Sequence, residues 1–218
     1  MFINAAIFDM DGTLIDSLVF WEVLWKNFGD KYCGGNKFTP KPEDDRAIRT
    51  MTLKDAMDFL HTNYGIAASG KELLDVTNEM MLDFYKNTVT VKPGVKDFLE
   101  HCYSNGIKMC LATATALDLV NIALKSCGLE KYFSRVFSCA VLGMGKDKPD
   151  IYLCAQEYLE TKTEEIWVFE DSFTALETAK SIGMKTVGIY DKCNPYQDKI
   201  KEISDQYIAQ GETLLKLI

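Results

Sequence analysis

Short apolar runs alternate with amphipathic stretches along the chain from residue 93 onward. Brief runs rich in β-branched and other apolar residues are typical of buried strands. We expect four such strands here and a fifth at the start of the chain: Phe2–Phe8, Ile107–Ala112, Val136–Val141, Ile166–Phe169 and Thr186–Tyr190. Between the later strands, apolar residues recur at helical spacing in Val95–Ser104, Leu117–Cys127, Pro149–Leu159 and Phe173–Ile182.

Glycines follow three of these predicted helices, at Gly106, Gly128 and Gly183. A glycine just past a helix readily takes the left-handed conformation that closes it. Strands that alternate with helices in this way predict a parallel sheet with helices on both faces. The expected core is therefore a doubly wound, Rossmann-like α/β fold.

Residues 17–90 interrupt the alternation. The first apolar positions of this block recur at helical spacing: Leu18, Trp21, Trp25 and Phe28. A loop rich in Gly, Pro and charge follows, and then two more helical stretches, Arg46–His61 and Gly70–Lys86, with no strand pattern. We predict a catalytic core formed by residues 1–16 and 91–218, with an all-α cap domain of residues 17–90 inserted after the first strand.

Charge and composition narrow the possible partners. The formal net charge of −8 over 218 residues repels a polyanion, and no basic stripe offsets it, so we expect no nucleic acid partner. Charged residues interrupt the apolar runs too often for a membrane protein, and the N-terminus lacks a signal-peptide pattern. The seven cysteines form no Cys-x-x-Cys pair and only two histidines are present, which disfavours a zinc site and indicates a reducing compartment. We expect a cytoplasmic monomer.

The first strand ends in the segment Asp9-Met10-Asp11-Gly12-Thr13. Ligand sites of open parallel sheets lie beyond the carboxyl ends of the strands, so both carboxylates are expected to face the ligand crevice. Gly12 allows the backbone to turn sharply. Two acids so close together can divide the work, one as a metal-bound nucleophile and the other as a proton donor and acceptor.

This segment resembles the first motif of the haloacid dehalogenase superfamily, DxDx(T/V) at the end of the first strand. The other three motifs of that superfamily have counterparts here in the right order, at the ends of later strands. They are Leu111-Ala112-Thr113, Lys146-Asp147-Lys148-Pro149-Asp150-Ile151-Tyr152 and Phe169-Glu170-Asp171-Ser172. The resemblance covers the whole chain and points to the branch that contains β-phosphoglucomutase-like proteins and phosphatases with a type-one helical cap.

The resemblance implies a role for each motif residue. Asp9 is the nucleophile that becomes transiently phosphorylated, and Asp11 is the general acid and base. Mg²⁺, a hard cation that prefers oxygen ligands, would be held by Asp9, the backbone carbonyl of Asp11 and Asp171, with Glu170 acting directly or through water. The Thr113 hydroxyl would hold a phosphoryl oxygen, and Lys146 would neutralise charge on the phosphoryl group and on Asp9.

Six further residues are expected to line the substrate site: Gly12, Thr13, Ala114, Thr115, Arg49 and Lys54. The N–H groups of Ala114 and Thr115 follow Thr113 and would donate to the phosphoryl oxygens. Arg49 and Lys54, with Arg46, are the cations of the predicted cap best placed to face the crevice, although a solvated helix face is the favoured explanation for any one of them.

Several assignments have alternatives. Lys148 can replace Lys146, because both precede Pro149, although the spacing to Pro-Asp favours Lys146. The family often has Pro where Asp147 stands here, which weakens that assignment. Glu170 can support the metal without touching it. Thr115, Asp150 and Ser172 can be helix caps, and Asp16 and Ser17 can shape the hinge.

An acid at position 11 separates the branches of the superfamily. Its dehalogenases lack this acid, so the resemblance implies a phosphatase acting on a small phosphorylated metabolite, such as a sugar phosphate. A phosphomutase of the β-phosphoglucomutase type is the alternative, but Trp21 stands where that mutase has a cap histidine. A non-enzymatic receiver module is disfavoured, because a receiver carries its phosphorylated Asp after the third strand and has no cap.

Overall fold

The computed structural model describes residues 2–48 and 51–218, apart from the side chain of Arg46. The chain divides into two compact units. The first, the core unit, comprises residues 1–18 and 89–218, and the second, the helical unit, comprises residues 19–88. The insertion therefore begins and ends two residues inside the predicted limits of 17 and 90.

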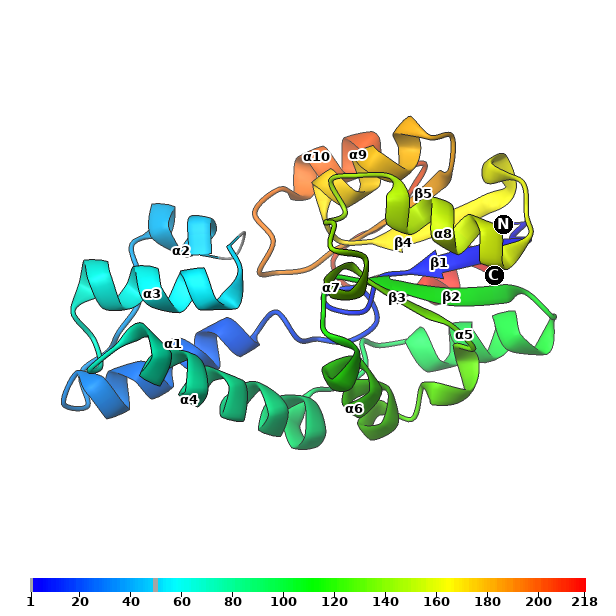
Figure 1. The fold of residues 1–218 in the computed structure, drawn as a ribbon. Coiled ribbons are helices and arrows are strands. Elements are labelled where there is room, and N and C mark those ends of the chain that lie inside the picture. The colour runs from blue at the N-terminus through cyan, green and yellow to red at the C-terminus, as the bar shows by residue number, and fades with distance from the viewer. Residues whose placement is uncertain (1, 49–50) are drawn as a thin grey trace. The chain divides into compact units, whose positions relative to one another are not determined.

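Six strands in the described part of the core unit form one parallel sheet in the order β3-β2-β1-β4-β5-β6 (Figure 1). The strands are β1 (Ala5–Phe8), β2 (Lys108–Thr113), β3 (Val136–Ser138), β4 (Ile166–Glu170), β5 (Lys185–Ile189) and β6 (Gln206–Ile208). The helices of this unit are α5 (Val95–Ser104), α6 (Leu117–Cys127), α7 (Cys139–Leu142), α8 (Asp150–Leu159), α9 (Phe173–Ser181) and α10 (Gln197–Ile203). Short 3₁₀ turns occur at Glu130–Tyr132, Thr163–Glu165 and Leu214–Leu217. The predicted α/β fold class is confirmed.

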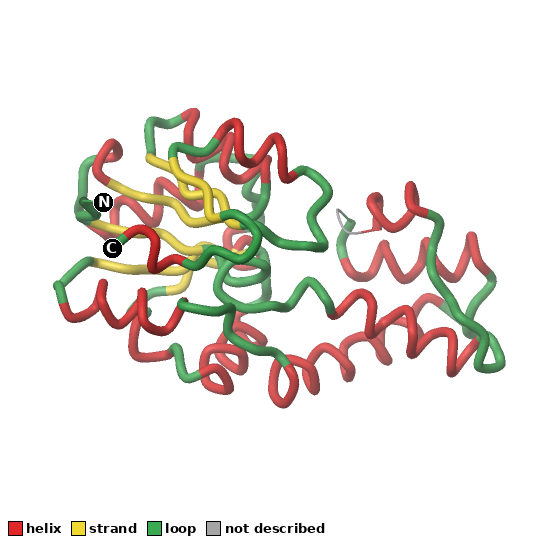
Figure 2. Tube along the Cα trace, turned by 180° about the vertical axis from the view of Figure 1, so that it is seen from behind, coloured by secondary structure: helices red, strands yellow, loops and turns green. Residues whose placement is uncertain are grey.

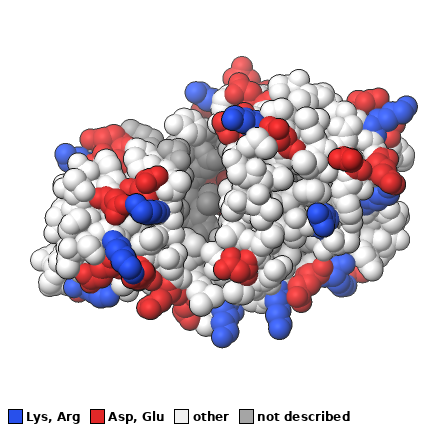
Figure 3. Space-filling model, in the orientation of Figure 1, with Lys and Arg blue, Asp and Glu red and all other residues white. Residues whose placement is uncertain are grey.

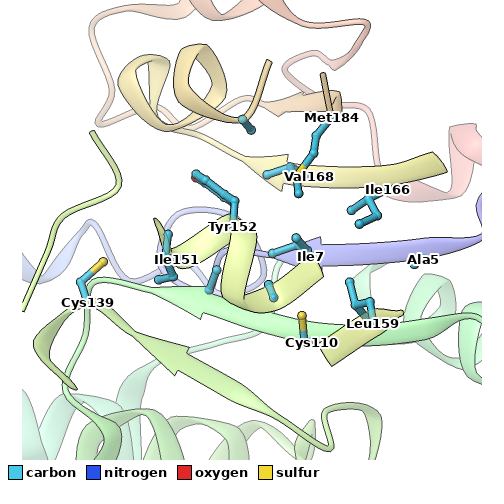
Figure 4. Close-up of a cluster of buried hydrophobic side chains, with 13 residues drawn as sticks. Ala5, Ile7, Cys110, Cys139, Ile151, Tyr152, Leu159, Ile166, Val168 and Met184 are labelled. Carbon is cyan, nitrogen blue, oxygen red and sulfur yellow. The ribbon is translucent and has the colours of Figure 1, made fainter. Parts of the chain in front are cut away.

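The sheet lies between two layers of helices (Figure 2). Alternate residues of the central strand β1 pack against the two helical layers, because successive side chains of a strand point to opposite faces. Ile7 belongs to a buried cluster with Val168 of β4 and Tyr152 of α8 (Figure 4). Phe8, its neighbour, stacks on Phe169 with ring centroids 4.4 Å apart and meets Phe98 of α5 at 6.3 Å. Both faces of β1 are therefore packed, and the end of the strand is fixed.

Two strand predictions need correction, and one strand was not predicted. The first strand begins at Ala5, and Phe2 is 82% exposed. The predicted strand Val136–Val141 ends at Ser138, because residues 139–142 form the helical turn α7, which Gly143 closes at φ +70°. Val141 is exposed, so its apolar character did not signal a buried strand. The short strand β6 was not predicted, since its three residues include a Gln and a Tyr and carry little apolar pattern.

The helical unit contains α1 (Phe20–Tyr32), α2 (Pro42–Ile48), α3 (Leu53–Tyr64) and α4 (Gly70–Asp83), and α4 continues as a π-helical segment, Phe84–Thr88. The prediction of one helix over Arg46–His61 is wrong. The Thr52 hydroxyl accepts a hydrogen bond from the Asp55 N–H at 3.2 Å and so begins a new helix, α3. Trp25 and Phe28 are buried, and their rings lie 6.0 Å apart, whereas Trp21 is half-buried.

The surface carries both signs of charge. On the face that Figure 3 shows, Lys and Arg side chains lie singly among Asp and Glu. In the described ranges, no helix has the length and apolar character needed to cross a membrane.

Candidate active site

Three acidic residues meet where the order of the sheet reverses, between β1 and β4. Asp9 directly follows β1, and its N–H donates to the carbonyl of Phe169 in β4 at 2.9 Å. Glu170 ends β4 and Asp171 follows it. One carboxylate oxygen from each of the three lies within 4.8 Å of the others, and all three residues are buried. Crevices at such a switch point are the usual ligand sites of doubly wound sheets.

Lys146 supplies positive charge to this cluster. Its Nζ forms an ion pair with Asp9 Oδ1 and a second one, at 2.6 Å, with Glu170 Oε1. Glu170 also accepts a 2.7 Å hydrogen bond from the Ser172 N–H at its other oxygen. Lys148 is exposed, so of the two candidate lysines the structure brings only Lys146 to Asp9.

The acids outnumber the cations at this point, and their pKa values reflect it. Burial, together with the charges of Glu170 and Asp11, raises the pKa of Asp9 to about 8 despite the opposing effect of Lys146. Burial and the charges of Glu170 and Asp9 raise the pKa of Asp171 well above its usual range. Burial alone would lower the pKa of Lys146, but Asp9 and Glu170 raise it. A cluster of three buried carboxylates with a single lysine therefore favours a bound cation, and its all-oxygen donor set fits a hard divalent ion.

Gly12 and Thr13 hold the carboxylate of Asp171 in place. The Thr13 hydroxyl is buried and donates to Asp171 Oδ1 at 3.3 Å. Gly12 has φ +77°, and a Cβ there would come within 2.7 Å of Asp171 Oδ2. A side chain at position 12 would thus be strained and would also displace the acid. The structure therefore places these two residues against a carboxylate of the cluster, whereas the sequence predicted them only as part of the substrate site.

Asp11 points to two hydroxyl groups. Its Oδ1 accepts from Ser17 and its Oδ2 from Thr115, each at 2.7 Å. Asp11 is only half-buried, and its side chain is not part of the cluster of three acids. The two hydroxyl donors orient a carboxylate that is partly open to solvent, which suits a group that exchanges protons.

The segment after β2 differs from its prediction in one respect. Thr113 is fully buried, and its hydroxyl oxygen accepts from the N–H of Thr115 at 3.1 Å. The Thr115 hydroxyl in turn bonds Asp11, and its carbonyl accepts from Ser138. The N–H and the hydroxyl of Thr115 therefore both bond neighbouring protein groups in this structure, and its role as a phosphoryl donor stays a prediction. Thr115 does not cap α6, because Ala116 is the N-cap of that helix. Ala114 is exposed.

Of the two predicted cap cations, the structure describes only Lys54. Arg49 lies outside the described residues. Lys54 lies in the first turn of α3, with 71% of its side chain exposed, and pairs with Asp58 at 2.8 Å. This i,i+4 pair explains its position without a ligand.

Three residues near the cluster, Asn194, Lys92 and Asp191, were not predicted from the sequence. Asn194 donates from Nδ2 to the main-chain carbonyl of Asp171 at 2.6 Å, and the buried ion pair of Lys92 with Asp191 lies at the end of β5. The available signal was position, since residues 191–194 directly follow the predicted strand Thr186–Tyr190 and so lie at the carboxyl edge of the sheet.

Comparison with known proteins agrees with the fold and the motifs. Residues 6–189 match the family of haloacid dehalogenase-like hydrolases. A phosphorylated carbohydrates phosphatase of Thermotoga maritima is 31% identical over 185 residues, which are 84% of this chain and 83% of that protein. A mitochondrial (DL)-glycerol-3-phosphatase of Arabidopsis thaliana is 27% identical over 95% of this chain and 70% of its own length. A crystal structure from Thermotoga maritima, provisionally assigned as a beta-phosphoglucomutase, superposes with a TM-score of 0.83 at 28% identity, covering 99% of this chain and 98% of that one.

Proposed function

The chain belongs to the haloacid dehalogenase-like hydrolases, and on that premise we propose that it is a Mg²⁺-dependent phosphatase that hydrolyses a small phosphorylated carbohydrate. The observation that carries the proposal is the buried cluster of Asp9, Glu170 and Asp171 with Lys146 at the switch point of the sheet. The name of the Thermotoga relative supports the substrate class.

Asp9, Asp171 and the backbone carbonyl of Asp11 are the groups proposed to hold the metal, and Glu170 contributes directly or through water. When bound, Mg²⁺ would supply the positive charge that keeps Asp9 and Asp171 ionised and that offsets the charge of the phosphoryl oxygens. Lys146 adds a second fixed charge, since it already touches Asp9.

In the first proposed step, a carboxylate oxygen of Asp9 attacks phosphorus and the bond from phosphorus to the leaving oxygen breaks. Asp11 gives its proton to that oxygen, so the product leaves as a neutral alcohol. The Thr113 hydroxyl and the N–H of Ala114 are the proposed donors to the phosphoryl oxygens. Preorganised donors of this kind act where charge develops and cost no reorganisation.

In the second step, Asp11 takes a proton from a water molecule, which attacks the phosphorus of the aspartyl phosphate on Asp9. The acyl phosphate bond breaks, inorganic phosphate leaves, and both carboxylates return to their starting states. Ser17 and Thr115 hold Asp11 in the same orientation in both steps. The helical unit is proposed to be the cap that excludes water and contacts the leaving group.

A phosphomutase is the second candidate, because the similar crystal structure from Thermotoga maritima carries that provisional assignment. Phosphate release from a panel of phosphorylated carbohydrates, with Mg²⁺ and with EDTA, separates the two. The panel includes β-glucose 1-phosphate with and without its bisphosphate. Release that requires Mg²⁺ is the expected result, and isomerisation that requires the bisphosphate, without release, would overturn the phosphatase in favour of the mutase.

A further inference from the structure

The loop between β5 and α10, residues 190–196, folds around the buried side chain of Asp191 (Figure 1, orange). Asp191 is 2% exposed, and its Oδ1 accepts from the Cys193 N–H at 2.8 Å. Its main-chain carbonyl accepts from the N–H of Asn194 at 3.1 Å and from Gln197 Nε2 at 2.7 Å. These bonds close the β5–α10 loop around Asp191.

Asn194 reaches from this loop to the acidic cluster. Its Nδ2 donates to the main-chain carbonyl of Asp171 at 2.6 Å, and its Oδ1 accepts from the Tyr196 N–H at 3.0 Å. Because Oδ1 faces an N–H donor, the amide has one satisfactory orientation, with Nδ2 on Asp171. Asp171 is thus held at its carboxylate by Thr13 and at its main chain by Asn194.

Lys92 fixes the same loop from the other side. Its Nζ donates to Asp191 Oδ2 at 2.7 Å and to the carbonyl of Tyr190 at 3.0 Å, and its side chain is 15% exposed. Its own N–H donates to the carbonyl of Leu14, close after the nucleophile segment, at 2.9 Å. Lys92 therefore ties the β5–α10 loop to the two chain segments that leave and re-enter the core unit.

The loop borders an open pocket of about 470 Å³, lined by Tyr190, Asp191 and Lys192 and by apolar side chains that include Val91, Ile208 and Leu214. The polar bonds described above hold the loop beside this pocket. Among these bonds, the Lys92–Asp191 ion pair joins two charged side chains that are 15% and 2% exposed.

We propose that Asn194 and the Lys92–Asp191 ion pair are positioning residues for the divalent-metal site. Asn194 fixes the main chain of Asp171, and the ion pair fixes the loop that carries Asn194. The inference rests on the proposed function, since it takes Asp171 to be a metal ligand. Groups that orient metal ligands typically change metal affinity by about ten- to a hundredfold when they are removed.

The test measures Mg²⁺ and Mn²⁺ binding to the metal-free protein by titration calorimetry, together with the melting temperature without metal. Asn194→Ala is compared with Asn105→Ala, because Asn105 makes the same kind of bond, from Nδ2 to the carbonyl of His101 at 2.8 Å, at an exposed site. We expect the dissociation constant for the metal to rise at least about tenfold in Asn194→Ala and to stay unchanged in Asn105→Ala. Equal affinities of Asn194→Ala and the unaltered protein would overturn the inference.

The ion pair is tested with Lys92→Met and with Lys92→Arg, which keeps the charge if the Met variant fails to fold. Lys180→Met is the matched control, since Lys180 also bonds one carbonyl, of Ile203, and one carboxylate, of Asp205. We expect weaker metal binding in both Lys92 variants, less so with Arg, and no change in Lys180→Met. Unchanged metal affinity in a folded Lys92 variant would remove the ion pair from the proposal.

The two proposals fail in different ways. If the unaltered protein binds the metal and the variants bind it weakly, but no substrate of the panel releases phosphate, only the proposed function is wrong. If phosphate release depends on Mg²⁺ and Asn194→Ala has an unchanged metal requirement, only the positioning inference is wrong. If the unaltered protein binds no metal, both are overturned.

Discussion

The hydroxyl of Thr115, just past β2, donates a 2.7 Å hydrogen bond to Oδ2 of Asp11, just past β1. Ser17 holds the other oxygen of the same carboxylate at an equal distance. Asp11, the general acid and base of the proposed reaction, therefore accepts hydrogen bonds from two hydroxyl groups in different parts of the core unit. Neither Thr115 nor Ser17 was predicted to orient this acid.

We expect Thr115→Val to lower kcat by about ten- to a hundredfold with little change in KM, because a hydrogen bond to a charged group contributes about 1.5–3 kcal/mol. Steady-state kinetics on the best panel substrate measures both constants. Thr161→Val is the control, since the Thr161 hydroxyl bonds only the nearby carbonyl of Leu159 among the contacts described. A Thr115→Val enzyme with unaltered kcat would show that Asp11 needs no such support.

Asp11→Asn removes the proposed proton donor and acceptor, and general acid–base catalysis is worth about 10²–10⁴ in rate. We expect turnover to stop or a phosphorylated form of the protein to accumulate. Intact-protein mass measured after an acid quench detects that form. A normal steady-state rate in Asp11→Asn contradicts the role, and Asp16→Asn serves as the neighbouring control.

Asp171→Ala takes one carboxylate from the buried cluster. We expect the Mg²⁺ concentration for half-maximal activity to rise by at least about tenfold. Removing a group that only orients a metal ligand already lowers metal affinity by about ten- to a hundredfold, and removing the ligand itself should lower it at least as much. A metal titration of activity measures it, with Glu164→Ala, an exposed acid, as control. If the titration curve does not move, Asp171 is not a ligand.

Asp9→Asn replaces the proposed nucleophile with an isosteric amide that cannot attack phosphorus as a carboxylate does. Turnover should be lost, while the circular dichroism spectrum stays that of the unaltered protein. Full activity in this variant would end the proposed mechanism.

The pKa of Asp9 also predicts how the metal-free protein responds to pH. Burial raises the pKa of Asp9 to about 8, whereas the pKa of an unfolded Asp is about 4. Between these two pH values the folded state therefore binds a proton at Asp9 that the unfolded state has released. Stability contributed by this group is therefore lost as pH rises from about 4 to about 8. Thermal melts in EDTA should show this decline in the unaltered protein and a shallower one in Asp9→Asn, and saturating Mg²⁺ should also flatten it. A steeper decline in Asp9→Asn would contradict the assignment.

The sequence was sufficient for the order of five strands and four helices of the core unit, because each of these carries its own apolar period, whereas β6, α7 and α10 are short and were not predicted. The predicted helices Val95–Ser104 and Leu117–Cys127 coincide with α5 and α6. Errors arose where another signal outweighed the period. Thr52 starts a helix inside a predicted one, and Gly143 closes the turn that replaces the end of a predicted strand.

Sheet geometry made only the residues at the strand ends predictable. Residues at the carboxyl ends of neighbouring parallel strands must meet, and the structure does bring Asp9, Glu170 and Asp171 together. The bonds from Thr115 to Asp11 and from Asn194 to Asp171 depend on the conformations of loops, which no periodicity encodes. The same holds for Lys92 and Asp191, which are far apart in the chain and pair only after the sheet has formed.

The place of β1 in the centre of the sheet has a consequence for synthesis on the ribosome. Its strand partners begin at Lys108 and Ile166, so the apolar segment Ala5–Phe8 emerges long before either of them. At about 5–20 residues per second, the nascent chain waits on the order of ten seconds for β4. The helical unit, whose contacts are local, can fold during this wait, whereas the sheet cannot close until the later strands arrive.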